Sequence, residues 1–328
     1  MKIKGILFVT IILLAAAFVS GCTAPKEEQM TELNIGYQPS THQIAHMTAM
    51  EKGWWAEDLA SFGIENINEY EFPTGAPEMQ AMLAGDLDIA YVGAAPVISA
   101  LSSGLDAKIV AGVQTQGSNL VLRPEINYTG PQDLKGLKIA TFPAGTIQDT
   151  LLRDWLKDNN IDPETDVEIV GMGPGDAINA ISASKVDGVF LPHPAPAIIE
   201  SEGNGVSVMA SGDMSKDHAC CVLVVSGKLI RENPALVEQI VSTHIKATEY
   251  NKNNVDEAGA IFSNKTGWEI EKVDKSLEDW DGAWISDPNL IVDSTVGYTT
   301  VQYDLGYIQK PLTKEDIFDL SFFEAVKM

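Results

Sequence analysis

The sequence predicts an α/β protein built from two similar lobes. Starting at Leu33 and again at Leu137, it repeats one order of strand, helix, strand, helix and strand. A β-prone run at residues 219–225 follows, and only helical segments are expected after it. The length of 328 residues also favours two cores, because chains above roughly 250–300 residues tend to divide into domains.

The first copy is marked out by capping and turn residues. A strand at residues 33–37 leads through Ser40 or Thr41, either of which can cap a helix that runs to about residue 55. Then come, in order, a strand at 69–72, a helix at 78–84 that ends at Gly85, a strand at 88–92, and a helix opened by Pro96. Proline is favoured in the first turn of a helix, which supports this last start.

The second copy follows the same order. Its expected elements are a strand at 137–141, a helix from Thr146 to about 157, a strand at 167–170, a helix at 177–184, a strand at 186–191, and a helix opened by Pro194 or Pro196. Strands separated by helices predict sheets that are mostly parallel, with right-handed crossovers. Each lobe is therefore expected to be a mostly parallel sheet flanked by helices.

Two crossing strands are expected to join the lobes and form a hinge. The outgoing one is placed at residues 119–123 and the returning one at 219–225. This assigns residues 32–120 and 222–328 to lobe 1 and residues 121–221 to lobe 2. The remaining helical segments are expected to pack on the back of the first lobe, at residues 233–251, 255–263, 269–280, 293–307 and 314–323.

The first residues indicate export. Lys2 and Lys4 precede an apolar run at 6–18, which is shorter than the roughly 20 apolar residues of a membrane span. Small residues then stand directly before Cys22, and this segment resembles the lipobox of prokaryotic lipoproteins. The resemblance implies that residues 1–21 are a signal peptide, that Cys22 carries lipid, and that the protein is anchored outside the cytoplasmic membrane. Residues 22–31 are expected to be a flexible stalk.

Composition excludes several function classes. There are 46 acidic against 22 Lys and Arg side chains, and the formal net charge of −24 would repel a phosphate backbone, so nucleic acid is not an expected partner. Three cysteines are too few for a disulfide scaffold. The sequence has neither a Gly-x-Ser-x-Gly elbow nor a Walker loop. No catalytic residue, metal or cofactor is therefore expected.

Ligands of open α/β sheets bind beyond the carboxyl ends of the strands, where helix N-termini also point. The residues at these positions are the candidate ligand contacts: Gln38, Ser40, Thr41, His42, Gly93, Ala94, Ala95, Gln114, Gln116, Phe142, Gly145, Thr146, His193 and His218. Because these loops hold no Lys or Arg, a small anion would depend on helix N-termini and hydroxyl groups. A protonated histidine would strengthen such binding, which predicts tighter binding at mildly acid pH.

Several of these residues have a simpler interpretation. Ser40, Thr41 and Thr146 would then only cap helices, and His42 would be a solvated first-turn residue. His42 and His46 are four residues apart, a spacing that metal sites use, although the general base of a His-Glu-x-x-His motif is absent. Strand alternation would turn Cys220 and Cys221 to opposite sides, as two small buried residues. A vicinal disulfide or a soft-metal site is the alternative for this pair.

Four motifs carry a resemblance to a known family: Gly36 to Ser40, Glu51 to Trp55, Gly85 to Ala90, and Gly136 to Ala140. With them, residues 33–323 resemble the NMT1-like solute-binding lipoproteins of ABC importers for nitrate, sulfonates and taurine. The resemblance implies a type II periplasmic-binding fold that closes on its ligand, acts as a monomer, and docks on a permease with its ATPase subunit. Nitrate and bicarbonate members tend to be longer, which favours an alkanesulfonate or taurine-like anion.

Other functions remain open at this point. Nitrate, bicarbonate or a thiamine-pyrimidine precursor could be the ligand instead. An enzyme similar to the pyrimidine-synthesising branch is another possibility, although that branch uses a longer cysteine-rich iron motif. A sensor or scaffold protein with a degenerate cleft is the third.

Overall fold

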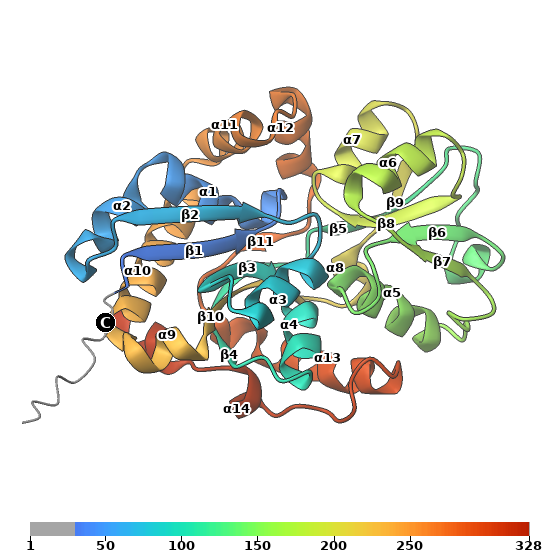
Figure 1. Cartoon of the computed structure of the whole chain (residues 1–328). Helices are drawn as coiled ribbons and strands as arrows, with labels where there is room; N and C mark the ends of the chain where they lie inside the picture. The colour runs from blue at the N-terminus through green and yellow to red at the C-terminus, as the bar shows by residue number, and fades with distance from the viewer. Residues whose placement is uncertain (1–29, 328) are drawn as a thin grey trace, which may run out of the picture.

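Two β-sheets organise the chain in a computed structural model that describes residues 30–327 (Figure 1). The strands of the six-stranded sheet, in the order β11-β4-β10-β3-β1-β2, are β1 (Glu32–Tyr37), β2 (Asn66–Glu71), β3 (Ile89–Gly93), β4 (Ala107–Thr115), β10 (Ala219–Ser226) and β11 (Ala283–Trp284). Those of the five-stranded sheet, in the order β7-β6-β8-β5-β9, are β5 (Ser118–Leu122), β6 (Lys138–Thr141), β7 (Glu168–Gly171), β8 (Gly188–Pro192) and β9 (Val206–Ala210). We call the six-stranded sheet with its helices the first lobe, and the five-stranded sheet with its helices the second lobe.

Helices fill the connections between the strands. The first copy contains η1 (Thr41–Gln43), α1 (Ile44–Glu51), α2 (Trp54–Leu59), η2 (Ala60–Phe62), α3 (Gly75–Ala84) and α4 (Ala94–Ser102). The second contains η3 (Pro131–Leu134), α5 (Ile147–Asp158), α6 (Pro174–Ser182), α7 (Ala195–Ser201) and α8 (Ser211–Met214). After β10 come α9 (Gly227–Glu232), α10 (Pro234–Asn253), α11 (Val255–Thr266), α12 (Ile270–Asp279), η4 (Pro288–Ile291), α13 (Val292–Asp304), α14 (Lys314–Ile317) and α15 (Ser321–Val326).

The strand pairing confirms the predicted two-lobed α/β fold. β1 pairs in parallel with β2 and β3, and β6 pairs in parallel with β7 and β8, so the two copies share one arrangement. The strands next to the segments that join the lobes pair in antiparallel fashion. β10 is antiparallel to β3 and β4, and β5 is antiparallel to β8 and β9. Each sheet is therefore parallel within its βαβ units and antiparallel where the chain enters or leaves it.

Alternation along the strands builds a core on each face of the second sheet. Leu120 and Leu122 of β5 belong to one cluster with Leu152 of α5, whereas Val121 belongs to another with Ala177 of α6. Figure 1 shows the same layering, with α5 on one side of this sheet and α6 and α7 on the other. Because successive side chains of a strand face opposite sides, one strand supplies both clusters.

The outgoing passage between the lobes differs from the predicted one. We expected it at residues 119–123, but β5 pairs within the second sheet along that stretch. The chain instead passes between the sheets at Gln116 and Gly117, with φ values of 57° and 83°. Asp281 holds this passage, because its Oδ1 accepts from Gly117 N at 2.8 Å and its Oδ2 accepts from Gly212 N of α8 at 2.6 Å.

The helices after β10 do more than cover the first lobe. α10 contacts α1, and α13 contacts α4, as expected for helices on the back of that lobe. However, α12 contacts α7 of the second lobe. Lys272 Nζ of α12 lies 3.1 Å from Glu202 Oε1, and Ser276 Oγ lies 3.0 Å from His193 Nδ1. The C-terminal part of the chain therefore touches both lobes.

Three strands, β4, β9 and β11, were not among the predicted elements. β9 carries no deeply buried side chain, and β11 has only two residues. Within residues 30–327, no helix combines the length and the apolar character that crossing a membrane requires. The predicted signal peptide, Cys22 and most of the stalk lie outside the described residues.

Candidate functional site

A small chamber lies where the two lobes meet. We call it the inner chamber; its volume is about 20 Å³, and by the general minimum of about 10–15 Å³ it could hold a water molecule. The first lobe contributes Gln38, Ser40, His42, Gly75, Gly93, Pro96, Cys220 and Cys221 to its lining. The second lobe contributes Phe142, Thr146, Ile147, Gln148 and Pro192.

Several helix N-termini converge on the inner chamber. Gly75 is the first residue of α3, and Gly93, Thr146 and Ser40 are the N-caps of α4, α5 and η1. Helix N-termini carry unpaired N–H groups and a partial positive charge, so they favour an anion. No Lys or Arg is among the described residues that line the chamber. An anion here would be held by backbone groups and neutral side chains.

A wider space, the outer chamber, adjoins the inner one and shares Gln38, Ser40, Phe142 and Pro192 with it. Its volume is about 150 Å³. The rest of its lining is Pro39, Pro73, Pro174, Gly175, Ile178, His193, Pro194, Ala195, Ile198 and Trp268. Pockets for drug-sized ligands span about 300–1,000 Å³, so this one suits a solute of few atoms with an apolar part.

The structure brings half of the expected contact residues to these chambers. Gln38, Ser40, His42, Gly93, Phe142 and Thr146 line the inner chamber, and His193 lines the outer one. Ser40 Oγ makes no capping hydrogen bond, whereas Thr146 Oγ1 caps α5 by accepting from Asp149 N at 3.4 Å. Of these two hydroxyl groups, only that of Thr146 is committed to its helix.

The other expected residues line neither chamber; they are Thr41, Ala94, Ala95, Gln114, Gln116, Gly145 and His218. Thr41 Oγ1 donates across the lobes to His193 O at 3.1 Å. Gln114 Nε2 donates to Gln116 O at 2.6 Å, and Gln116 Nε2 donates to Asp281 O at 2.7 Å, so both amides stabilise the crossing. His218 Nδ1 lies 3.0 Å from the hydroxyl of Tyr298.

Sequence reasoning missed several residues of the lining. Gly75 and Gln148 lie in the first turns of α3 and α5, the same position that led to the other candidates, so this signal could have found them. Gln148 Nε2 donates to Ser118 Oγ of β5 at 3.1 Å. Trp268 lies between α11 and α12, and no local pattern in the sequence points to its place beside the cleft.

The two histidines four residues apart do not share a site. His46 Nε2 lies 2.9 Å from Glu69 Oε1, and burial lowers the pKa of His46. His42 instead meets the two cysteines, which alternation was expected to separate; their sulfurs lie only 3.8 Å apart. The hydrogen bond from Cys220, opposed by burial and assisted by His42, lowers the pKa of Cys221.

The expected tightening of ligand binding at mildly acid pH has no support from His193 or His218. Burial lowers the pKa of His193 to about 3, and burial likewise lowers the pKa of His218. With a pKa of about 3, His193 stays neutral between pH 5 and 8.

We therefore expect the ring signals of His193 to stay constant from pH 8 to pH 5. Nuclear magnetic resonance of the imidazole carbons and nitrogens would measure this titration, with a short histidine-containing peptide as the control. A titration midpoint inside this range would show that the imidazole is accessible to protons and would contradict the expectation.

A buried carboxyl group stands behind Gln38. Glu78 is fully buried in the first turn of α3, and its Oε2 accepts from Gln38 Nε2 at 2.7 Å. Burial raises the pKa of Glu78 well above its ordinary value, and the nearby Cys221 adds to the shift. The folded protein thus keeps a proton that the unfolded chain loses above about pH 4.5.

Glu78→Gln is expected to stabilise the fold at neutral pH. While Glu78 stays protonated, each pH unit above its unfolded pKa costs the wild type about 1.4 kcal/mol of folding free energy, and a glutamine amide avoids this cost. The variant should exceed the wild type by at least about 1.4 kcal/mol in urea unfolding at pH 7, and the gain should vanish near pH 4.5.

The matched control is Glu65→Gln, at an exposed carboxyl group. Its effect should stay within about 0.5 kcal/mol at both pH values. A Glu78→Gln variant that is less stable than the wild type at pH 7 would mean that the carboxyl group is ionised and paired in the folded protein.

Comparisons with known proteins bear on this site. A profile of the NMT1-like family matches residues 26–262. The chain is 27% identical over 332 residues to a Bacillus subtilis (strain 168) protein provisionally named as binding aliphatic sulfonates, covering 99% of this chain and 96% of the relative. It is 25% identical over 279 residues to the nitrate/nitrite binding protein NrtA of Nostoc sp., covering 79% and 63% of the two chains.

A solved structure shows the same fold. The alkanesulfonate-binding protein SsuA from Xanthomonas axonopodis pv. citri, crystallised with MOPS, superposes with a TM-score of 0.78 at 18% identity. The match covers 88% of this chain and 99% of that one.

Proposed function

The chain belongs to the NMT1-like family, and on that premise we propose that it is an extracytoplasmic solute-binding receptor of an ABC importer. Its solute is a small anion, an alkanesulfonate or a taurine-like compound, and it binds between the lobes without being chemically changed. An importer permease and its ATPase subunit are the partners, and the receptor acts as a monomer tethered by lipid on Cys22.

The convergence of helix N-termini beside an apolar outer chamber carries this proposal. The N-termini of α3, α4 and α5 favour the charged end of an alkanesulfonate. The alkyl part would extend between Pro39, Ile178 and Trp268. Nitrate and bicarbonate have no apolar part to occupy this space, which is why we favour a sulfonate. The aliphatic-sulfonate relative agrees with this choice.

A thermal-unfolding series tests both the receptor and its solute. The whole chain is heated with ethanesulfonate, taurine, nitrate, bicarbonate or a pyrimidine, each over a range of concentrations. A ligand at a hundred times its Kd stabilises the folded state by about 2.7 kcal/mol, so a bound solute gives a clear rise in Tm. A rise with nitrate or bicarbonate alone would overturn the sulfonate proposal, and no rise with any solute would overturn the receptor proposal.

The lipid anchor has its own test. Cys22→Ser should release the protein from the membrane fraction of cells that express it, and the wild type should carry acyl groups detectable by mass spectrometry. An unmodified Cys22 in membrane-bound protein would contradict the anchor.

Gln302 of α13 links the two lobes. Its Nε2 donates to Ala95 O at 3.0 Å and to Gly145 O of the second lobe at 3.2 Å. Gln302→Leu removes these bonds and leaves the two carbonyl groups without them, at a cost of about 1–2 kcal/mol. Because the bond to Gly145 joins the lobes, we expect solute affinity to fall about tenfold in isothermal calorimetry. Gln309→Leu, at an exposed glutamine, is the matched control and should bind normally.

A further inference from the structure

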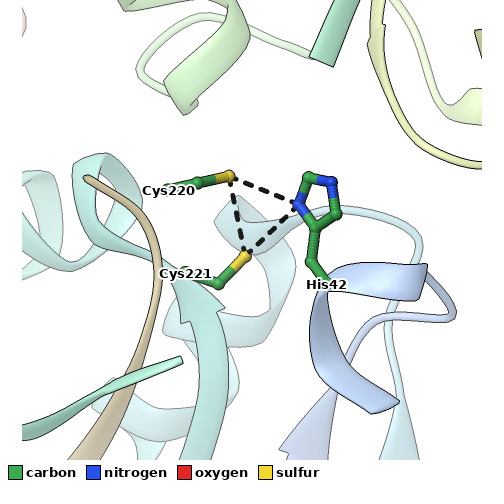
Figure 2. A group of neighbouring side chains, drawn as sticks. All are labelled: His42, Cys220 and Cys221. Carbon is green, nitrogen blue, oxygen red and sulfur yellow. Dashed lines mark hydrogen bonds between the residues drawn. The ribbon is translucent and has the colours of Figure 1, made fainter. Parts of the chain in front are cut away.

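Three side chains that line the inner chamber, His42, Cys220 and Cys221, form a compact cluster (Figure 2). Cys220 Sγ lies 3.4 Å from His42 Nδ1, Cys221 Sγ lies 3.8 Å from the same nitrogen, and the two sulfurs are 3.8 Å apart. All three residues are at most 5% exposed, and both cysteines are free thiols. Binding of an anion by helix N-termini does not require this cluster.

The imidazole of His42 is fixed with its lone pair toward the sulfurs. Its Nε2 lies 2.8 Å from Gly117 O at the lobe crossing. A carbonyl oxygen can only accept, so Nε2 donates the hydrogen and Nδ1 of the neutral ring is left as the acceptor. Histidines that bind metals usually donate their other ring N–H in this way, which sets both the tautomer and the ring orientation.

An irregularity in β10 turns both thiols to one side. Neighbouring side chains of a regular strand face opposite sides. However, the register of β10 against β4 shifts between Ala219 and Cys221 and again between Cys221 and Val222. Cys220 has no register partner on β3 or β4, as expected for the extra residue of a β-bulge. The bulge therefore brings two adjacent thiols to the same nitrogen.

The spacing of these atoms matches three corners of a tetrahedron around zinc. With Zn–S near 2.3 Å and Zn–N near 2.05 Å, a tetrahedral ion separates two sulfur ligands by about 3.8 Å and a sulfur from a nitrogen by about 3.6 Å. The observed separations of 3.8, 3.4 and 3.8 Å lie within about 0.2 Å of these values. Little movement is needed to receive an ion.

We propose that His42, Cys220 and Cys221 bind one thiophilic closed-shell cation, such as Zn²⁺ or Cu⁺, at the floor of the cleft. Nδ1 and the two sulfurs are the ligands, and binding releases to solvent the protons that the sulfurs still carry. A tetrahedral ion keeps a fourth position, which opens to the inner chamber and accepts a water molecule. The test uses the metal alone, so its outcome does not depend on the proposed solute.

Titration of the whole reduced chain under argon tests the site directly. Zn²⁺ should bind with one-to-one stoichiometry in isothermal calorimetry and should protect both thiols from a maleimide reagent. Co²⁺, a spectroscopic substitute for Zn²⁺, should give the near-ultraviolet charge-transfer band of a thiolate complex and the visible bands of tetrahedral geometry.

Substitutions separate this site from adventitious binding. Cys220→Ser, Cys221→Ser and His42→Gln should each weaken Zn²⁺ binding roughly a hundredfold or more, because each removes one of three protein ligands. His244→Gln is the matched control, since that imidazole lies 2.7 Å from Gly112 O and lines neither chamber; Zn²⁺ affinity should be unchanged. Circular dichroism would show which variants fold.

Three results would overturn the proposal. The first is Zn²⁺ binding that is equal in the wild type and both serine variants. The second is a Co²⁺ complex without thiolate charge transfer in the wild-type protein, a measurement that does not depend on any variant folding. The third is a Cys220–Cys221 disulfide, seen as a mass lower by two hydrogens, that persists after reductant treatment.

Discussion

Gly117→Ala is expected to lower the free energy of unfolding by about 2–5 kcal/mol. Gly117 adopts a φ of 83°, where an L side chain costs about 1–2 kcal/mol. A Cβ atom there would also lie 2.4 Å from Gln114 Nε2 and 2.8 Å from His42 Nε2. These neighbours are buried, so relieving the overlap adds an overpacking cost of about 1–3 kcal/mol.

Gly53→Ala separates the two contributions. Gly53 has a φ of 69° but no heavy atom within 4 Å of a Cβ built on it, so only the backbone cost of about 1–2 kcal/mol applies. Urea unfolding of both variants at one pH would give the difference. Equal losses would show that the crossing has room for a methyl group, and would contradict the tight packing around Gly117.

Phe190→Ala is expected to destabilise the second lobe by about 3–5 kcal/mol. Phe190 lies on β8, the middle strand of its sheet, and its side chain is fully buried. It packs in one cluster with Leu120, Leu152 and Trp155, so truncation leaves a cavity between the sheet and α5. Both the lost transfer free energy and the cavity contribute to the cost.

Hydrogen exchange would locate this effect. Amides of β5, β6 and β8 should exchange faster in the Phe190→Ala variant, whereas those of β1 and β3 should keep their wild-type rates. Phe190→Leu, which fills more of the space, should lose less than about 1.5 kcal/mol. Uniformly faster exchange in both sheets would show that the lobes unfold as one unit.

The sequence predicts the repeated units well because local signals mark their ends. Pro39, Gly85 and Pro96 separate the apolar runs of the first copy, and each βαβ unit can be recognised from such signals alone. The passage between the lobes was misplaced because the chain changes direction within only two residues, Gln116 and Gly117. The β-prone runs before and after them give no sign of which sheet each one joins. β9 escaped prediction because it buries little apolar surface.

Half of the expected contact residues line the two chambers, because first-turn positions follow from the strand and helix order. Whether a first-turn residue reaches the chamber depends on rotation of the helix, which is why Gln148 lines it and Ala95 does not. The cysteine pair could not be placed correctly from the sequence at all. Alternation predicts opposite sides for Cys220 and Cys221, and the bulge that reverses this depends on pairing with β3 and β4.

The contact of α12 with α7 constrains how the lobes can separate to bind the proposed solute. A simple swing about Gly117 would pull Ser276 from His193 and Lys272 from Glu202. Either those contacts break with every cycle, or α12 travels with the second lobe and the segments beside it bend. In the proposed receptor, opening of the lobes would therefore have to break the contacts of α12 as well as turn the chain at Gln116 and Gly117.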